Sequence, residues 1–195
     1  MVLFRRLVVF VCLLAVSCYG KTPRKAADVP VKLSDGKTIH LTQYRGKVVM
    51  VVMFLTTCPE CVETIKFLGR LQTQLDPKYF QPIAISLDPD PKVVAPFVQR
   101  YRPTFPVGHL DKDAAIKLGD MTADARPIVP VIIYIDWMGN VRFQYYGNDA
   151  IFQQAPKNIS TIAGGLVKQA IERTGPKYAT RPANQAQQPP QQAKP

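Results

Sequence analysis

The sequence VVMVVMFLTTCPEC, residues 48–61, decides how the rest of the chain is arranged. Its first eight residues are apolar and rich in valine, which is typical of a strand buried on both faces of a sheet. The next segment spaces its apolar residues at steps of three and four, which predicts one face of a helix: Cys61, Ile65, Leu68, Leu71 and Leu75. The Cys-x-x-Cys motif therefore lies where a buried strand leads into a helix.

Strand and helix patterns alternate along the remaining sequence. A hairpin is expected around Asp35-Gly36, with strands at 31–33 and 38–41. Further strands are expected at 81–87, 107–110, 129–135 and 141–146, and further helices at 93–100, 112–118 and 159–171, the last capped by Asn158 or Ser160. This order predicts an α/β fold, a three-layer α/β/α sandwich with a mixed sheet and an added N-terminal β-hairpin.

The two ends of the chain differ in composition from this domain. Residues 1–20 resemble a secretory signal, with Arg5-Arg6 before an apolar stretch that is too short for a bilayer span. Cleavage near Gly20, lipidation at Cys18 in a lipobox-like sequence and an uncleaved anchor remain alternatives. All three predict an extracytoplasmic, periplasmic domain at 29–174, after a linker at 21–28. A Pro/Gln-rich tail at 175–195 is expected to be disordered.

The net charge of +11 comes from Lys and Arg residues that are scattered singly or in pairs. Nucleic-acid binding would need a basic stripe with interleaved aromatic residues or a known binding module, and neither is present in the sequence. The charge therefore supports only a mild attraction to anionic membrane surfaces or acidic partners.

Two of the four cysteines, Cys58 and Cys61, lie in the predicted domain. They close too short a loop to stabilise the fold as a disulfide. At a helix start, backbone N–H groups and the helix dipole favour a thiolate at Cys58, which makes it the attacking thiol. Cys61, one turn later, would resolve the mixed disulfide.

The two residues between the cysteines should tune this redox pair. Pro59 suits a first helical turn, where its missing N–H costs nothing. Glu60 places a negative charge between the thiols and opposes thiolate formation. We predict a Cys58 pKa below the free-cysteine value of about 8.5 but not extreme, which a thiol titration would check.

Other chemistry for the pair is weighed against redox exchange. Half of a zinc site would need a second cysteine pair or two placed histidines, and His40 and His109 are distant in sequence. A passive disulfide is the other alternative. The favoured interpretation needs no metal and no cofactor beyond the redox-active disulfide.

Pro130 has two interpretations. It could simply open a strand, where proline is tolerated. Alternatively, a cis Val129–Pro130 bond could lie opposite the cysteines and present the Val129 backbone to an incoming peptide.

The chain resembles the thioredoxin superfamily, and within it the TlpA-like or ResA-like extracytoplasmic proteins. The resemblance covers about residues 29–173 and rests on 35–37, 44–49, 54–61, 105–107 and the segments from Val129-Pro130 to Val141. It implies a thioredoxin fold, a redox-active Cys58–Cys61 pair, a cis-Pro130 and substrate contacts from Thr57, Val129 and Pro130. The implied partners are exported cysteine-containing proteins, apocytochrome c among them, and a membrane or periplasmic electron donor or acceptor. A membrane tether through the N-terminus is also implied.

Some residues depart from the family pattern. Thr57 replaces the usual tryptophan, proline follows the first cysteine instead of preceding the second, and Thr64 occupies a position that is often acidic. Because the inter-cysteine residues set the potential, the direction of electron flow does not follow from the resemblance. Three alternatives remain: a peroxiredoxin-like peroxidase, suggested by Thr56-Thr57, a non-catalytic binding module, and a copper chaperone of related fold.

Overall fold

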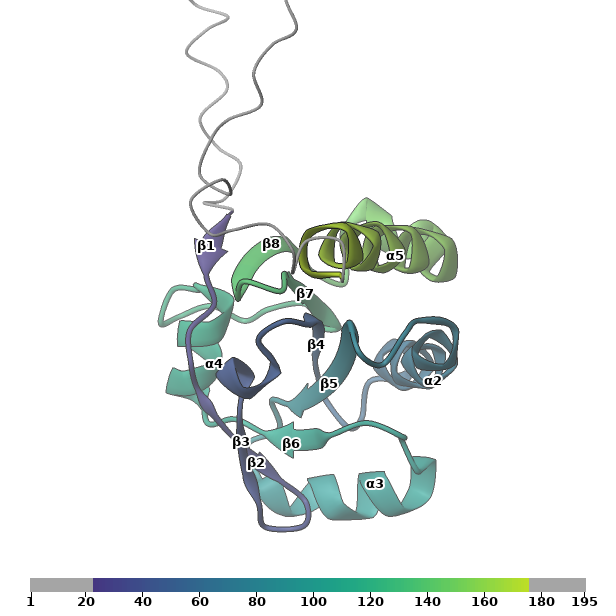
Figure 1. Ribbon diagram of the computed structural model, residues 1–195. Coiled ribbons are helices and arrows are strands. Elements are labelled where there is room, and N and C mark those ends of the chain that lie inside the picture. The colour runs from purple at the N-terminus through teal and green to yellow at the C-terminus, as the bar shows by residue number, and fades with distance from the viewer. Residues whose placement is uncertain (1–22, 176–195) are drawn as a thin grey trace, which may run out of the picture.

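The computed structural model describes residues 23–175 as one mixed sheet with helices on both faces (Figure 1). The strands lie in the order β1-β8-β7-β4-β5-β6-β2-β3. Their bounds are β1 Arg24–Lys25, β2 Pro30–Leu33, β3 Thr38–His40, β4 Val48–Phe54, β5 Phe80–Ser86, β6 Val107–His109, β7 Val131–Ile135 and β8 Asn140–Tyr145. The helices are α2 Pro59–Gln74, α3 Val94–Tyr101, α4 Lys112–Gly119 and α5 Ala155–Thr174, with 3-10 turns η1 Leu41–Tyr44, η2 Pro91–Val93 and η3 Ala150–Gln154.

Strand β4 is the centre of the sheet, and all seven of its residues are buried. It pairs parallel with β5 and antiparallel with β7, so the sheet is mixed, as predicted. Successive β4 residues alternate between two cores because side chains of a strand point to opposite faces. Val48, Met50, Val52 and Phe54 pack toward α2, α3 and α5, whereas Val49, Val51 and Met53 pack toward α4 and the N-terminal segment (Figure 1).

Two local expectations need correction. Helix α5 begins at Ala155, so neither Asn158 nor Ser160 caps it, because Pro156 fits the first helical turn and allows an earlier start. The Asn158 side chain instead donates to the Ile151 carbonyl. The predicted linker at 21–28 contains strand β1, which pairs with β8 and is held by Arg24 hydrogen bonds to the Leu118 carbonyl and the Gln144 side chain.

The predicted signal segment at 1–20, with its Cys18 lipidation alternative, and the predicted tail beyond Gly175 lie outside the described residues. Within residues 23–175, no helix has the length and apolar character needed to cross a membrane.

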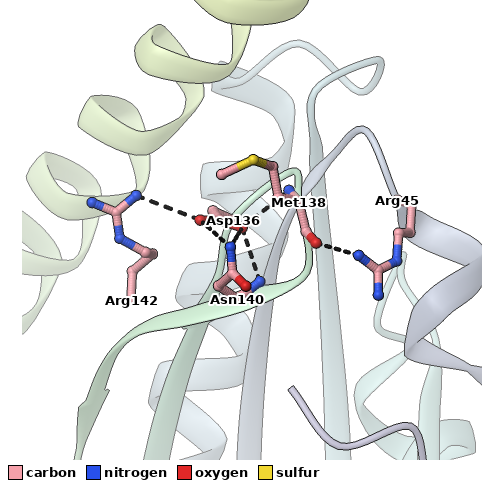
Figure 2. Close-up of polar contacts among 5 residues, drawn as sticks. All are labelled: Arg45, Asp136, Met138, Asn140 and Arg142. Atoms are coloured by element: carbon pink, nitrogen blue, oxygen red, sulfur yellow. Dashed lines mark hydrogen bonds and ion pairs between the residues drawn. The ribbon is translucent and has the colours of Figure 1, made fainter. Parts of the chain in front are cut away.

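A buried carboxylate holds the hairpin turn between β7 and β8 (Figure 2). Asp136 is 2% exposed and accepts hydrogen bonds from the Met138 and Asn140 N–H groups and from the Asn140 side chain. Arg142 lies 3.5 Å from the same carboxylate, and Arg45 donates to the Met138 carbonyl from the other side of the turn. The groups that contact the Asp136 carboxylate, namely the two backbone N–H groups and the Asn140 and Arg142 side chains, are therefore all hydrogen-bond donors.

We expect Asp136→Asn to lower the free energy of unfolding by about 1–3 kcal/mol, because the new amide N–H₂ faces donors instead of accepting from them. Urea unfolding followed by circular dichroism measures the change. The control Glu172→Gln removes an exposed carboxylate near the end of α5 and should stay within about 0.5 kcal/mol of wild type. Equal stability of both variants would contradict the role of Asp136.

Candidate active site

Cys58 is the N-cap residue of α2, directly after the loop that leaves β4. It forms a disulfide with Cys61, and their Cα atoms are 5.3 Å apart. The Cys61 N–H lies 3.2 Å from the Cys58 sulfur and donates to it, and Pro59 is the first residue of the helix. Cys58 is half-buried whereas Cys61 is fully buried, so an incoming substrate can reach Cys58 more readily. Cys58 does not titrate while it is bonded to Cys61, so the lowered pKa of its thiol in the reduced protein stays a prediction.

The loop before Cys58 is held by Asp88, which the sequence analysis missed. Asp88 follows β5, and its carboxylate accepts from the Thr56 N–H at 2.9 Å and from the Thr56 hydroxyl at 3.1 Å. The buried Ser86 hydroxyl donates to the same carboxylate at 2.8 Å. A signal was available, since parallel β4 and β5 end at the same edge of the sheet and Asp88 stands just beyond β5.

We expect Asp88→Ala to slow the reaction of the reduced cysteine pair with a small disulfide by about tenfold, because the unpaired Thr56 N–H lets the loop and Cys58 move. Asp88→Asn should recover most of the rate, since its amide oxygen can still accept from Thr56 and Ser86. Stopped-flow kinetics with 5,5′-dithiobis(2-nitrobenzoate) measures both variants. A wild-type rate for Asp88→Ala would show that the loop needs no such support.

A cleft of about 690 Å³ lies beside the cysteine motif and brings together residues distant in sequence. Four predicted site residues line it: Pro59, Glu60, Val129 and Pro130. Thr57, the remaining predicted substrate contact, is exposed and is not part of this lining. The structure therefore joins the start of α2 to the Val129–Pro130 segment in one concave surface.

The Val129–Pro130 peptide bond is cis, as the family resemblance implied. Within residues 23–175, the Val129 N–H and carbonyl make no hydrogen bond to the chain. Gly147 lies against this backbone, and a Cβ at Gly147 would come 2.5 Å from the Val129 carbonyl oxygen. The Gly147 N–H also donates to the carbonyl of Ile128, the residue before Val129, at 2.7 Å. Gly147 therefore leaves no room for a side chain beside the Val129 carbonyl and helps to set the position of this backbone.

Other cleft residues escaped the sequence analysis because they come from elements that meet only in the fold. Helix α2 contributes Glu63, Thr64, Phe67 and Arg70, and the region around η3 and α5 contributes Phe152, Ala155, Pro156 and Ile159. Behind this wall, the Tyr134 hydroxyl donates to the Ile159 carbonyl at 3.4 Å, and burial raises the pKa of Tyr134. The side of the cleft formed by η3 and α5 is therefore apolar, and the charged residues that line the cleft all lie on α2.

No group of three or more His, Cys, Asp or Glu side chains in the described part of the chain is arranged to hold a metal ion. His40 and His109 are strand-end residues, and His109 Nε2 contacts the Asp88 carbonyl at 2.8 Å.

The chain is similar to the thiol-disulfide oxidoreductase ResA of Oceanobacillus iheyensis, with 34% identity over 83 residues. That match covers 43% of this chain and 43% of the relative, so it spans less than half of the relative's length.

Solved structures share the fold. A structure from Bacteroides thetaiotaomicron, assigned as a protein disulfide isomerase, has a TM-score of 0.63 and 24% identity, covering 78% of this chain and 94% of its own. A thiol:disulfide interchange protein of the thioredoxin family from Chlorobium tepidum has a TM-score of 0.62 and 19% identity, covering 76% and 99%. The redoxin family model matches residues 22–158. This chain therefore has a thioredoxin fold and belongs to the redoxin family.

Proposed function

We propose that this protein is a thiol–disulfide oxidoreductase that acts through the Cys58–Cys61 pair. The observation that carries the proposal is the position of a half-buried Cys58 at a helix N-cap, bonded to a buried Cys61 and beside a cleft. The α2 N-terminus favours a thiolate at Cys58 because the Cys61 N–H donates to the sulfur and the positive end of the helix dipole lies beside it. The similarity to ResA supports the same chemistry.

Each half-reaction transfers one pair of electrons. In the reducing direction, the Cys58 thiolate attacks one sulfur of a substrate disulfide, and the other substrate sulfur leaves as a thiolate and takes up a proton. The Cys61 thiolate then attacks the Cys58 sulfur of the mixed disulfide. This second step forms the Cys58–Cys61 disulfide and releases the other substrate thiol. An electron donor must reduce the pair again, and the oxidising direction is the reverse of these steps.

We assign the remaining roles on the same basis. Val129 and Pro130 border the cleft, where the free Val129 backbone can pair with an extended substrate segment. Thr57, which is exposed and precedes Cys58 in the sequence, is the remaining proposed substrate contact. Pro59 and Glu60 tune the potential of the pair.

The proposed location is extracytoplasmic, because the N-terminal sequence resembles a secretory signal and disulfide exchange serves oxidising compartments. The proposed substrates are exported proteins with cysteine pairs, and apocytochrome c is the substrate that the family resemblance implies. A membrane or periplasmic protein would supply or accept electrons.

The peroxidase alternative rests on Thr56-Thr57, and Thr56 directs both its N–H and its hydroxyl toward Asp88. Insulin disulfide reduction and peroxide consumption, measured side by side with dithiothreitol as donor, separate the two functions. We expect insulin reduction without peroxide turnover. Peroxide turnover alone would establish the peroxidase, and neither activity would favour a binding module.

A further inference from the structure

Three charged side chains line the cleft, and all three come from α2. Glu60 and Glu63 lie at the end of the helix next to the cysteines, and Arg70 lies about two turns beyond Glu63. The other lining residues are apolar or uncharged. The cleft is therefore acidic near Cys58 and basic at its far end.

The acidic end is available to a ligand. Glu60 is exposed and forms no ion pair within residues 23–175, whereas Glu63 is paired with Lys66 at 2.7 Å. The chain as a whole carries a net charge of +11, so this acidic site is a local exception on a basic protein. Its attraction for a cation acts over short distances, because salt screens exposed charges beyond about 8–10 Å.

The basic end lies near an aromatic ring. The Arg70 guanidinium carbon lies 5.8 Å from the centre of the Phe67 ring. Glu60 and Arg70 are ten residues apart on one helix, which corresponds to about 15 Å. An extended peptide covers that length in about four or five residues.

We propose that these charges select the substrate: the cleft favours an extended peptide with Lys or Arg beside its disulfide-bonded cysteine and an acidic residue about four residues away. This inference rests on the proposed function and adds the substrate class to it. Glu60 faces the basic neighbours of the substrate cysteine, Glu63 contributes less because it is paired with Lys66, and Arg70 faces the distant acidic residue. Apolar contacts from Phe67, Ile128 and Phe152 hold the segment between them.

Synthetic peptides test the selection. Each peptide carries one cysteine in a mixed disulfide with 5-thio-2-nitrobenzoate, flanked on both sides by Lys, Gln or Glu. The Cys58 thiolate attacks the peptide sulfur, the nitrobenzoate thiolate leaves and is measured by its absorbance, and Cys61 then releases the peptide thiol. The full chain is reduced beforehand, and the rate of Cys58→Ser is subtracted as the contribution of the three other cysteines, Cys12, Cys18 and Cys61.

We expect wild type to react about threefold to tenfold faster with the Lys peptide than with the Glu peptide in about 0.01 M salt, and the ratio to approach one in about 1 M salt. Glu60→Gln with Glu63→Gln should bring the ratio toward one at low salt. The control Glu172→Gln makes the same charge change on α5, away from the cleft, and should keep the wild-type ratio. Each variant is judged by the ratio of its rates with the Lys and Glu peptides. A change in the intrinsic reactivity of Cys58 affects both rates equally and therefore cancels.

A second peptide pair tests Arg70. Adding Glu four residues from the cysteine on both sides of the Lys peptide should raise the wild-type rate about twofold to fivefold, and Arg70→Gln should remove this gain. Equal rates of wild type with Lys, Gln and Glu peptides would overturn the inference while leaving the proposed function intact. No rate above Cys58→Ser with any peptide would instead overturn the proposed function.

Discussion

Cys58→Ser should lower insulin disulfide reduction by about a thousandfold or more, to the uncatalysed rate. A serine hydroxyl at the α2 N-cap can still accept the Cys61 N–H, so the helix start is kept. What is lost is the sulfur nucleophile that begins the exchange. The measurement is the rate of insulin precipitation with dithiothreitol, alongside a thermal unfolding curve that confirms the fold.

Cys61→Ser separates the roles of the two sulfurs. Because Cys61 is buried, it should not begin the reaction, and its loss should leave the first attack by Cys58 fast while blocking release of the substrate. A single-turnover assay with an aryl disulfide should therefore give a near wild-type first step for Cys61→Ser and none for Cys58→Ser. The reverse pattern would exchange the two assignments.

Gly147→Ala should lower kcat/KM for insulin by about tenfold to a hundredfold, with less than about a twofold change for a small aryl disulfide. The added Cβ would come 2.5 Å from the Val129 oxygen and 2.9 Å from the Val129 carbonyl carbon, so the Val129 backbone must move. A peptide substrate needs that backbone as a partner, whereas a small disulfide needs only Cys58. Parallel steady-state assays with the two substrates measure the difference.

Gly164→Ala in α5 is the matched control, because nothing lies within 4 Å of its added Cβ. Both activities of this variant should equal those of wild type. If Gly147→Ala lowered both activities equally, the cause would be a disturbed cysteine pair or fold, and the role of Gly147 in substrate binding would be wrong.

The sequence predicted the architecture because its strongest patterns coincide with buried elements. The apolar run of β4, the helical spacing of α2 and the turn at Asp35-Gly36 each have a local cause, and the structure contains all three elements. The cis bond before Pro130 was also expected, from the family resemblance. The position of Cys58 at the start of α2 was predicted because the buried strand β4 leads into that helix.

Features that depend on the approach of distant segments could not be predicted in this way. Asp88 is 32 residues from Thr56, and Gly147 meets Val129 only because both flank the paired strands β7 and β8. The short strand β1 is stabilised by Arg24 contacts to α4 and β8, which no local pattern in the sequence reveals. The start of α5 was predicted too late because the apolar spacing begins at Ile159, whereas the helix begins at Ala155 with Pro156 in its first turn.

Trapping a mixed disulfide tests directly whether Cys58 exchanges disulfides with protein substrates. Reduced Cys61→Ser is incubated with insulin, quenched with acid and alkylated, and its adducts are located by peptide mass spectrometry. We expect an insulin chain linked through Cys58 and lost on treatment with dithiothreitol. Free, alkylated Cys58 with no insulin adduct, in a preparation that is folded and fully reduced, would contradict it.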